Sequence, residues 1–555
     1  MDAITITEEL YNLDNQTLVS KIPALFAQAA TIQETLLKQI IANNVSCEWG
    51  KKYHFDQIQT IEEYRKLVPI TTWEDVKPYS DRMIEGENGL LFSENVKQFM
   101  FTSGSTGKGK FIPESRMSEV ARGLVLRLRQ IFDVQAAPQL YALIKQAKTQ
   151  GIKGRLLSLA NVRVDEATTP SGIPIVYASG QTMAQSKLNS YLAFPTLLHL
   201  VKNSNAKDYL IMRFSIEHPD VYVISGNNAS RLSYLIQFAE IHKEQLLLDI
   251  EQGTIDYAGE IEDSIKEQLQ PLLTPNPERA QTLRKALEEG KPFTPATYWP
   301  DLMLGLFWLS ASVGRFVKDV RPLLPATTRF MDVGYGASEA KFNLPMVPED
   351  PAGALSIATT FFEFLPTEGG APLLAHELKE GKQYELIITT WGGLYRYNMQ
   401  DIVVCKGFVG TTPKIEFVTK SIEIINICDE KVYPCNIINS AEHTLAAHGI
   451  TLKQVQIYGD AEARYYHFFI ETEEDTDSLD KNSFEKELQQ QLIEQAEGYK
   501  VFSASNVLKP LKVTWMKKGW QESLIQARLS SGISRTQIKL PIVIKERPQK
   551  SWNQE

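Results

Sequence analysis

The sequence predicts an α/β protein with a large N-terminal domain of mixed sheets and helices and a small, mobile α+β domain at its C-terminal end. Three observations support this fold class. The 555 residues are too many for one hydrophobic core. Short apolar strands alternate with helical patterns over the first half of the chain. The last quarter repeats strand and helix on a smaller scale, after a turn rich in Gly, Thr and Pro.

The first half opens with a helical pattern. Apolar residues recur at helical spacing over residues 17–42, with a kink expected at Pro23. We then expect strands at 98–102, 173–178 and 221–225, with helices at 183–200 and 231–251 after the second and the third. Strands that are apolar on both faces, each followed by a helix, are typical of a parallel sheet covered by helices.

The later part of the chain predicts further strands and a domain boundary. Aromatic and β-branched residues predict strands at 356–365 and 384–390. A strand at 401–408 ends in the turn at 410–413, so we assign residues 1–415 to the large domain and 416–555 to the small one. In the small domain we expect strands at 454–458, 467–471 and 513–516, and a helix near 483–494.

The composition excludes several classes of function. A net charge of −9 argues against binding to a nucleic-acid backbone. The four cysteines form no C-x-x-C pair, which fits free thiols in a reducing cytosol, and the histidines lack zinc-ligand spacing. The first residues lack a signal-peptide pattern, and the apolar stretch at 302–313 is too short to cross a bilayer. We expect a cytoplasmic monomer that binds neither nucleic acid nor membrane.

The segment Thr102–Lys110 is the strongest candidate for chemistry. It follows a predicted strand and combines three glycines, four hydroxyl residues and two lysines. Glycines let the backbone approach a phosphate closely, hydroxyls donate hydrogen bonds to its oxygens, and lysines offset its charge. The segment therefore predicts a loop that holds a triphosphate.

Three interpretations of this loop compete. Residues 104–110 have the spacing of a Walker A loop, but Phe111 stands where a Ser or Thr should ligate Mg²⁺. A flexible surface turn would have a similar composition. The third interpretation is the phosphate loop of an adenylate-forming enzyme, which requires matching segments elsewhere in the chain.

Two later segments are candidates for that match. Tyr335–Glu339 places an aromatic ring among small residues, ahead of a hydroxyl and a carboxylate that suit phosphate and Mg²⁺. A capped strand-to-turn transition explains this segment equally well. Tyr395–Asp401 brings an acid to the start of a strand, where it is suited to ribose hydroxyls, but a solvated strand end has the same pattern.

Together and in this order, these segments resemble the acyl-adenylate-forming superfamily of acyl-CoA synthetases, luciferases and peptide-synthetase adenylation domains. Within it, the chain is most similar to the Gretchen Hagen (auxin-responsive promoter) family of acyl-acid amido synthetases, nearly from end to end. The similar segments are Val68–Tyr79, Phe361–Pro366, Tyr395–Asp401 with Lys406–Phe408, and Gln537–Pro541. The aromatic strand Phe361–Pro366 favours this family over ordinary acyl-CoA synthetases.

The resemblance implies a large adenylate-forming domain that binds ATP, and a small domain that carries a late catalytic lysine, Lys539. Glu339 would bind Mg²⁺ and act in catalysis. The implied ATP-binding residues are Ser103, Gly104, Ser105, Thr106, Gly107, Lys108, Tyr335, Gly336, Ala337, Ser338, Asp401 and Lys420. The chain departs from the family pattern at Gln400, where Gly normally precedes the acid, and at Leu540 and Ile542, which replace Thr and Arg. Lys420 stands where the superfamily often has a hinge Arg.

The resemblance also implies the reaction. A carboxylic acid attacks the α-phosphorus of ATP and forms an acyl-adenylate with release of pyrophosphate. The small domain then rotates, and an amine, expected to be that of an amino acid, displaces AMP to form an amide. The base that deprotonates the amine is not identified. Two alternatives stay open: transfer to coenzyme A, and a non-catalytic binding protein of the same fold.

Overall fold

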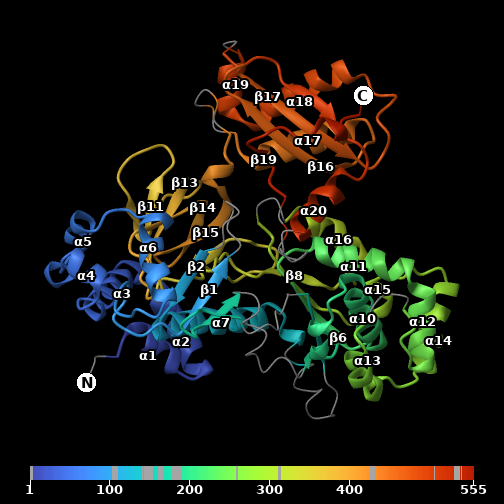
Figure 1. Cartoon of the computed structure of the whole chain (residues 1–555), viewed down its shortest axis with the longest axis horizontal. Helices are drawn as coiled ribbons and strands as arrows, with labels where there is room; N and C mark the ends of the chain where they lie inside the picture. Colours follow the sequence, from blue (N-terminus) through green and yellow to red (C-terminus); the bar gives the residue numbers. More distant parts are fainter. Residues whose placement is uncertain are drawn as a thin grey trace. The chain divides into compact units, whose positions relative to one another are not determined.

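The computed structural model describes residues 4–102, 110–140, 142, 154–159, 167–177, 191–257, 261–310, 314–425, 427, 430, 432–504, 507–530, 538 and 540–554. These form two compact units. The first comprises Met1–Met399 and Val403–Phe417, and the second comprises Gln400–Ile402 and Val418–Glu555. Each unit is described by itself below, and Figure 1 gives the labels of the elements.

The N-terminal part of the first unit is helical. Its helices are α1 (Ile6–Asn12), α2 (Asn15–Phe26), α3 (Ala29–Asn43), α4 (Glu48–Lys52), α5 (Ile61–Leu67) and α6 (Trp73–Ile84), with the 3₁₀ turn η1 (Phe55–Gln57). The predicted helix at 17–42 is thus two helices. Pro23 lies inside α2, and the break falls at residues 27 and 28, after the expected kink.

The break has a cause far away in the sequence. The backbone N–H of Thr411 donates to the Phe26 carbonyl (2.9 Å), and the backbone N–H of Ala29 donates to the Thr411 hydroxyl (3.0 Å). Gly410 has φ +60°, and a Cβ there would come within 2.7 Å of the Phe26 oxygen. A glycine turn therefore inserts at the helix ends and satisfies their backbone groups.

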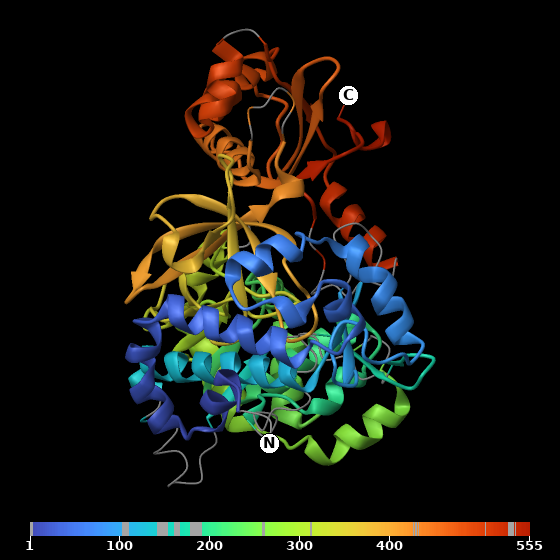
Figure 2. The same ribbon diagram turned by 90° about the vertical axis from the view of Figure 1, so that its left-hand side faces the viewer.

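A four-stranded sheet with the order β2-β1-β5-β4 follows the helices. Its strands are β1 (Gln98–Thr102), β2 (Lys110–Glu114), β4 (Ala167–Thr168) and β5 (Pro174–Tyr177). β1 and β2 pair antiparallel, with Thr102 opposite Lys110, so they bracket the predicted phosphate loop. The long helix α7 (Arg116–Ala136) then packs against α1, and Figure 2 shows it in cyan beside the blue N-terminal helices.

A second four-stranded sheet is parallel throughout, in the order β3-β6-β7-β8. Its strands are β3 (Arg155–Ser158), β6 (Val221–Ser225), β7 (Leu304–Phe307) and β8 (Arg329–Asp332). Figure 1 shows helices, drawn in green, gathered around it. They are α10 (Ser204–Glu217), α11 (Ser230–Ile241), α12 (Lys243–Gln252), α13 (Asp263–Leu269), α14 (Pro277–Glu288), α15 (Pro295–Tyr298) and α16 (Arg315–Val320), with 3₁₀ turns η3 (Thr196–Leu200), η4 (Gln270–Leu272) and η6 (Arg321–Leu323). The predicted α/β architecture is confirmed here.

A seven-stranded sheet has the order β12-β11-β13-β14-β15-β10-β9. The strands are β9 (Asn343–Pro345), β10 (Gly353–Leu355), β11 (Phe361–Pro366), β12 (Leu373–Leu374), β13 (Gln383–Thr389), β14 (Tyr397–Val409) and β15 (Thr412–Lys420), with 3₁₀ turn η7 (Ala375–Glu377). The first unit ends within β15, after Phe417.

The second unit is an α+β structure around a sheet with the order β18-β17-β16-β19. Its strands are β16 (Leu452–Asp460), β17 (Tyr465–Thr472), β18 (Lys512–Trp515) and β19 (Val543–Ile544). Its helices are α17 (Pro434–Ala447), α18 (Lys481–Gln495), α19 (Glu497–Ala504) and α20 (Trp520–Ser530), with 3₁₀ turns η8 (Ser421–Glu423) and η10 (Lys550–Trp552). Residues of α17 and α18 share one hydrophobic core with β16 and β17.

Two other predicted elements differ from the structure. The helix expected at 231–251 is divided into α11 and α12 at His242, and the strand expected from 356 begins at Phe361. The helix expected at 183–200 falls partly outside the described residues, and its described end is the 3₁₀ turn η3. No described helix combines the length and the apolar character needed to span a bilayer.

Candidate functional site

The predicted phosphate and metal segment is a tight turn after β8. The backbone N–H of Ala337 donates to the Ala340 carbonyl (2.9 Å), which places Ser338 and Glu339 at the tip of the turn. Gly336 pairs with Lys341 across it, and a Cβ on Gly336 would come within 2.5 Å of the lysine Cδ. The glycine therefore gives the lysine stem room to lie across the turn.

Asp332 fixes the beginning of this turn. Its carboxylate accepts the backbone N–H of Gly334 and that of Leu309, both at 2.7 Å. Gly334 has φ +85°, a left-handed conformation that glycine adopts without strain. Burial raises the pKa of Asp332 to about 6. The turn thus begins from a buried carboxyl that holds its backbone in place.

The ring of Tyr335, the predicted purine neighbour, lies between two other aromatic rings. Its centroid is 5.1 Å from that of Phe417, nearly stacked, and 4.7 Å from that of Phe342. Asn343 accepts the backbone N–H of Tyr335 (2.7 Å) and donates to the Ile415 carbonyl (2.8 Å). The turn is therefore anchored to β15.

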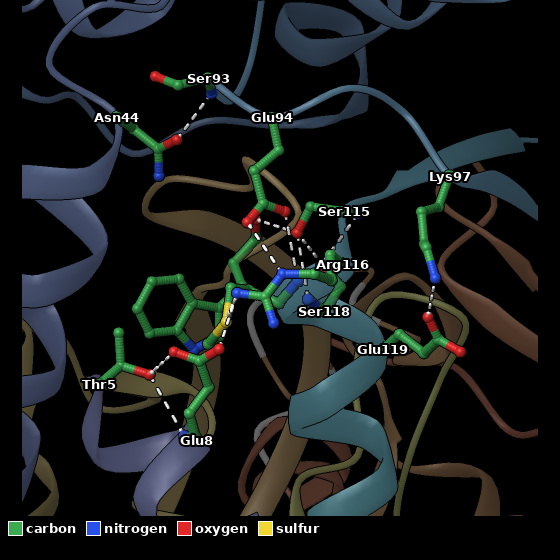
Figure 3. A network of polar contacts seen from close by, with 12 residues as sticks. Thr5, Glu8, Asn44, Ser93, Glu94, Lys97, Ser115, Arg116, Ser118 and Glu119 are labelled. Carbon is green, nitrogen blue, oxygen red and sulfur yellow. Dashed lines mark hydrogen bonds and ion pairs between the residues drawn. The ribbon is translucent and has the colours of Figure 1, made fainter. Parts of the chain in front are cut away.

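Helix α7 holds the other side of the turn. Ser115 caps its N-terminus by accepting the backbone N–H of Ser118 (3.1 Å), and the Ser115 hydroxyl donates to the Trp391 carbonyl (3.0 Å). Figure 3 shows the surrounding network, in which Arg116 pairs with Glu8 of α1 at 2.7 Å. These contacts fix the start of the helix that carries Arg122.

Arg122 connects α7 to the turn directly. Its Nη2 donates to the Ser338 carbonyl (3.1 Å), and its Nε donates to Glu114 (2.9 Å). Neither Arg122 nor Lys341 was among the predicted site residues. Their sequence signal is weak because each is a single charged residue, and only the fold brings them together.

The predicted ribose acid lies in the second unit, beside the predicted hinge lysine. Lys420 Nζ lies 2.6 Å from Asp401 Oδ1, and Asp401 is buried. Gln400 has φ +54° and stands where the family has Gly. Glycine adopts this left-handed conformation at a lower cost than glutamine does.

Two of the family-like segments meet through one buried ion pair in the first unit. Glu363 of β11 accepts the Nε of Arg396 (2.9 Å) and the Nη2 of the same residue (3.1 Å). Arg396 Nη1 donates to the carbonyls of Arg65 and Val68. Arg65 adds a second cation to Glu363, with Nε at 2.9 Å. The aromatic strand and the Tyr-Arg-Tyr segment therefore form one electrostatic unit.

Several predicted residues lie outside the described part of the chain. These are Ser103, Gly104, Ser105, Thr106, Gly107, Lys108 and Lys539. The structure brings Tyr335, Gly336, Ala337, Ser338 and Glu339 together in one turn of the first unit, and Asp401 and Lys420 together in the second.

Comparison with protein families matches most of the chain in three consecutive parts. The GH3 family N-terminal domain matches residues 18–328, the GH3 family central domain 353–420 and the GH3 family C-terminal domain 436–548. The 4-substituted benzoates-glutamate ligase GH3.12 of Arabidopsis thaliana is 24% identical and covers 96% of both chains. Jasmonoyl–L-amino acid synthetase JAR6 of Nicotiana attenuata is 26% identical, over 75% of this chain and 74% of its own.

Solved structures share the fold. The GH3.15 acyl acid amido synthetase superposes with a TM-score of 0.79 at 22% identity, over 96% of this chain and 95% of the other. A 2-hydroxyisobutyryl-CoA ligase, in the postadenylation state, gives a TM-score of 0.51 at 12% identity over 97% and 92%. The chain therefore shares the fold of these two enzymes. The chain belongs to the GH3 family of acyl-acid amido synthetases.

Proposed function

We propose that this protein uses ATP to activate a carboxylic acid as an acyl-adenylate and then transfers the acyl group to an amino acid. One observation carries this proposal. The three GH3 family domains match in order along the chain, and the benzoate–glutamate ligase relative is covered over 96% of its length. Family membership supplies the reaction class, and the resemblance of single segments supplies the residues that we propose to perform it.

In this proposal, the residues that the resemblance singles out hold the nucleotide. Ser338 binds the α-phosphate, the loop at 103–108 binds the β- and γ-phosphates, and Asp401 binds the ribose hydroxyls. Tyr335 flanks the base together with Gly336 and Ala337. Lys420 acts at the hinge, and its ion pair with Asp401 brings a cation to the ribose site. Residues 1–415 act as the ATP- and acid-binding domain, and 416–555 deliver Lys539.

The turn suits Mg²⁺. Glu339 offers one carboxylate at the tip of the turn, and Mg²⁺ is commonly held by one or two carboxylates together with substrate phosphates. The described residues contain no cluster of three or more acidic, histidine or cysteine ligands, which this mode of binding does not need. Bound there, Mg²⁺ would neutralise phosphate charge.

Adenylation needs no catalytic base because the attacking oxygen is already ionised. The work of the protein is to position the carboxylate in line with the α-phosphorus and to stabilise the charge that develops there. Lys539 does this by bridging the carboxylate and the α-phosphate. Loss of one such donor costs roughly 3 kcal/mol, or about a hundredfold in rate. The amine then attacks the acyl carbon and AMP departs.

A panel of carboxylic acids, scored for AMP release with and without the twenty amino acids, tests this proposal. We expect AMP release that needs an acid and that rises with a subset of the amino acids. AMP release that depends on coenzyme A and ignores amines would contradict the proposed acceptor. A Lys539→Ala variant should lose acid-dependent pyrophosphate exchange, and normal exchange by this variant would reject the assigned role of the lysine.

A further inference from the structure

A small cavity lies beside the 336–341 turn, entirely within the first unit. Its walls come from α7, from the turn, from the segment before β11 and from the end of β13. Its volume is about 30 Å³. That is room for about two water molecules, or for one group of the size of a carboxylate.

Arg122 supplies one cation to this cavity. Its side chain is 10% exposed, and two of its nitrogens are committed, to Glu114 and to the Ser338 carbonyl. The third, Nη1, is buried and has no hydrogen-bond partner among the described residues. A guanidinium held rigidly by two bonds, with a third nitrogen left over, is prepared to bind an anion.

Lys341 supplies a second cation. Its stem lies against Gly336, and no carboxylate in the described part of the chain forms an ion pair with it. The lysine side chain is partly exposed and lines the same cavity. It brings a second positive charge close to the Arg122 guanidinium. A bound anion would offset the repulsion between these two cations.

Thr390 adds a neutral donor. Its Oγ1 is buried and has no partner among the described residues, although it lines the same cavity. The neighbouring Thr389 differs, because its Oγ1 accepts the backbone N–H of Arg396 (3.0 Å) and bonds the Tyr64 hydroxyl (2.7 Å). Buried polar groups are normally satisfied, so two buried and unsatisfied donors around one cavity, beside a lysine, are a pattern and not an accident of packing.

We propose that Arg122, Lys341 and Thr390 form a subsite for a substrate carboxylate that is not the one activated by ATP. This inference rests on the proposed function. The activated carboxylate must lie against the α-phosphate, and a cavity of about 30 Å³ has no room for both groups. A spare carboxylate is carried by every amino acid acceptor, and also by any dicarboxylic acyl acid.

Steady-state kinetics of the full-length enzyme test the subsite. The acid that gives the most AMP in the panel is paired with L-alanine, and separately with L-alaninamide, which keeps the amine and lacks the carboxylate. For the wild type we expect kcat/KM to favour alanine by about 10- to 100-fold. In Lys341→Met this preference should largely disappear through a higher KM for alanine. Lys341→Arg should restore part of it.

A second arm separates the two sources of the carboxylate. With L-alaninamide as acceptor, glutarate is compared with its monomethyl ester. If the subsite serves the acyl acid, Lys341→Met loses the preference for glutarate and keeps that for alanine. Acetate, as a free carboxylate, should inhibit the wild type competitively against whichever substrate uses the subsite, and should inhibit Lys341→Met several-fold less.

Controls keep the outcomes distinct. Lys97→Met removes an exposed lysine of the same unit, which pairs with Glu119 at the surface, and should leave both preferences unchanged. Thermal unfolding confirms that each variant is folded. If Lys341→Met keeps the wild-type preferences in both arms, the subsite is rejected while the proposed function stands. If no acid and amine give AMP, it is the proposed function that fails.

Discussion

The first unit contains two buried clusters of charge that differ in how completely their polar groups are paired. At the centre of the Glu363–Arg396 cluster, both carboxylate oxygens and all three Arg396 nitrogens have partners, while Nη2 of the flanking Arg65 has none among the described residues. In the Arg122–Lys341 cluster, a guanidinium nitrogen of Arg122 and the hydroxyl of Thr390 are buried and have no partner among the described residues. A satisfied network makes structure rigid, whereas an unsatisfied one keeps a cost that a ligand can remove. The difference assigns a structural role to the first cluster and binding to the second.

The largest expected effect is on the satisfied cluster. Glu363→Gln removes the charge that compensates Arg396 and keeps the shape, so the first unit should lose about 3–5 kcal/mol of stability. Urea unfolding measures this loss. Lys341→Met is the matched comparison, and it should keep or gain stability because it removes a cation that lies beside Arg122 and has no ion-pair partner among the described residues. If Glu363→Gln loses less than about 1 kcal/mol of stability, the two clusters do not differ in how much they stabilise the first unit.

Asp332 is intermediate between the two clusters in how completely it is paired. It accepts backbone hydrogen bonds but forms no ion pair among the described residues. Its pKa is raised by burial to about 6 in the folded protein, from 3.8. The folded state therefore binds the proton more tightly, and the stability that this contributes is lost as the pH rises from about 4 to about 6. Relative to Asp332→Asn, the wild type should lose roughly 2–3 kcal/mol over that range.

Urea unfolding of both proteins at pH 4 and pH 7 measures the difference. The Asn side chain can still accept one of the two backbone N–H groups, so the variant should remain folded. If the difference between the two proteins is the same at both pH values, the carboxyl does not titrate in the folded unit with a raised pKa.

Gln400 has the smallest expected effect. It is exposed and adopts φ +54°, whereas Arg396 adopts φ +47° within the satisfied cluster. The Arg396 conformation is held by its buried network. Gln400→Gly relieves the left-handed strain and should stabilise the protein by about 0.5–1 kcal/mol. A thermal melt with a lower midpoint than the wild type would show that the Gln side chain makes a compensating contact.

Local patterns predicted much of the fold. β1 and β6 have the expected limits because short apolar runs between turn residues are read from neighbouring residues alone. The break between α2 and α3 was misplaced because its cause, the turn at 410–412, lies far along the chain. Pro23 is accommodated inside α2.

The candidate site also divides into residues that a local pattern predicts and residues that only long-range packing brings together. The Tyr335–Glu339 segment and Asp401 carry local motifs and could be selected from the sequence. Arg122 and Lys341 could not be selected in this way, because neither belongs to a local motif. They line one cavity only through long-range packing of the fold. The Glu363–Arg396 pair was visible as two family-like segments, but their contact was not.

One isotope measurement tests the central claim most directly. The enzyme is supplied with ATP, an amino acid and an acid labelled with ¹⁸O in its carboxylate, and the nucleotide product is examined by mass spectrometry. An acyl-adenylate leaves one carboxylate oxygen on phosphorus when the amine displaces it, so AMP should carry one ¹⁸O atom. Release of ADP, with the label in inorganic phosphate, would show that the acid is activated as an acyl phosphate and would contradict the account.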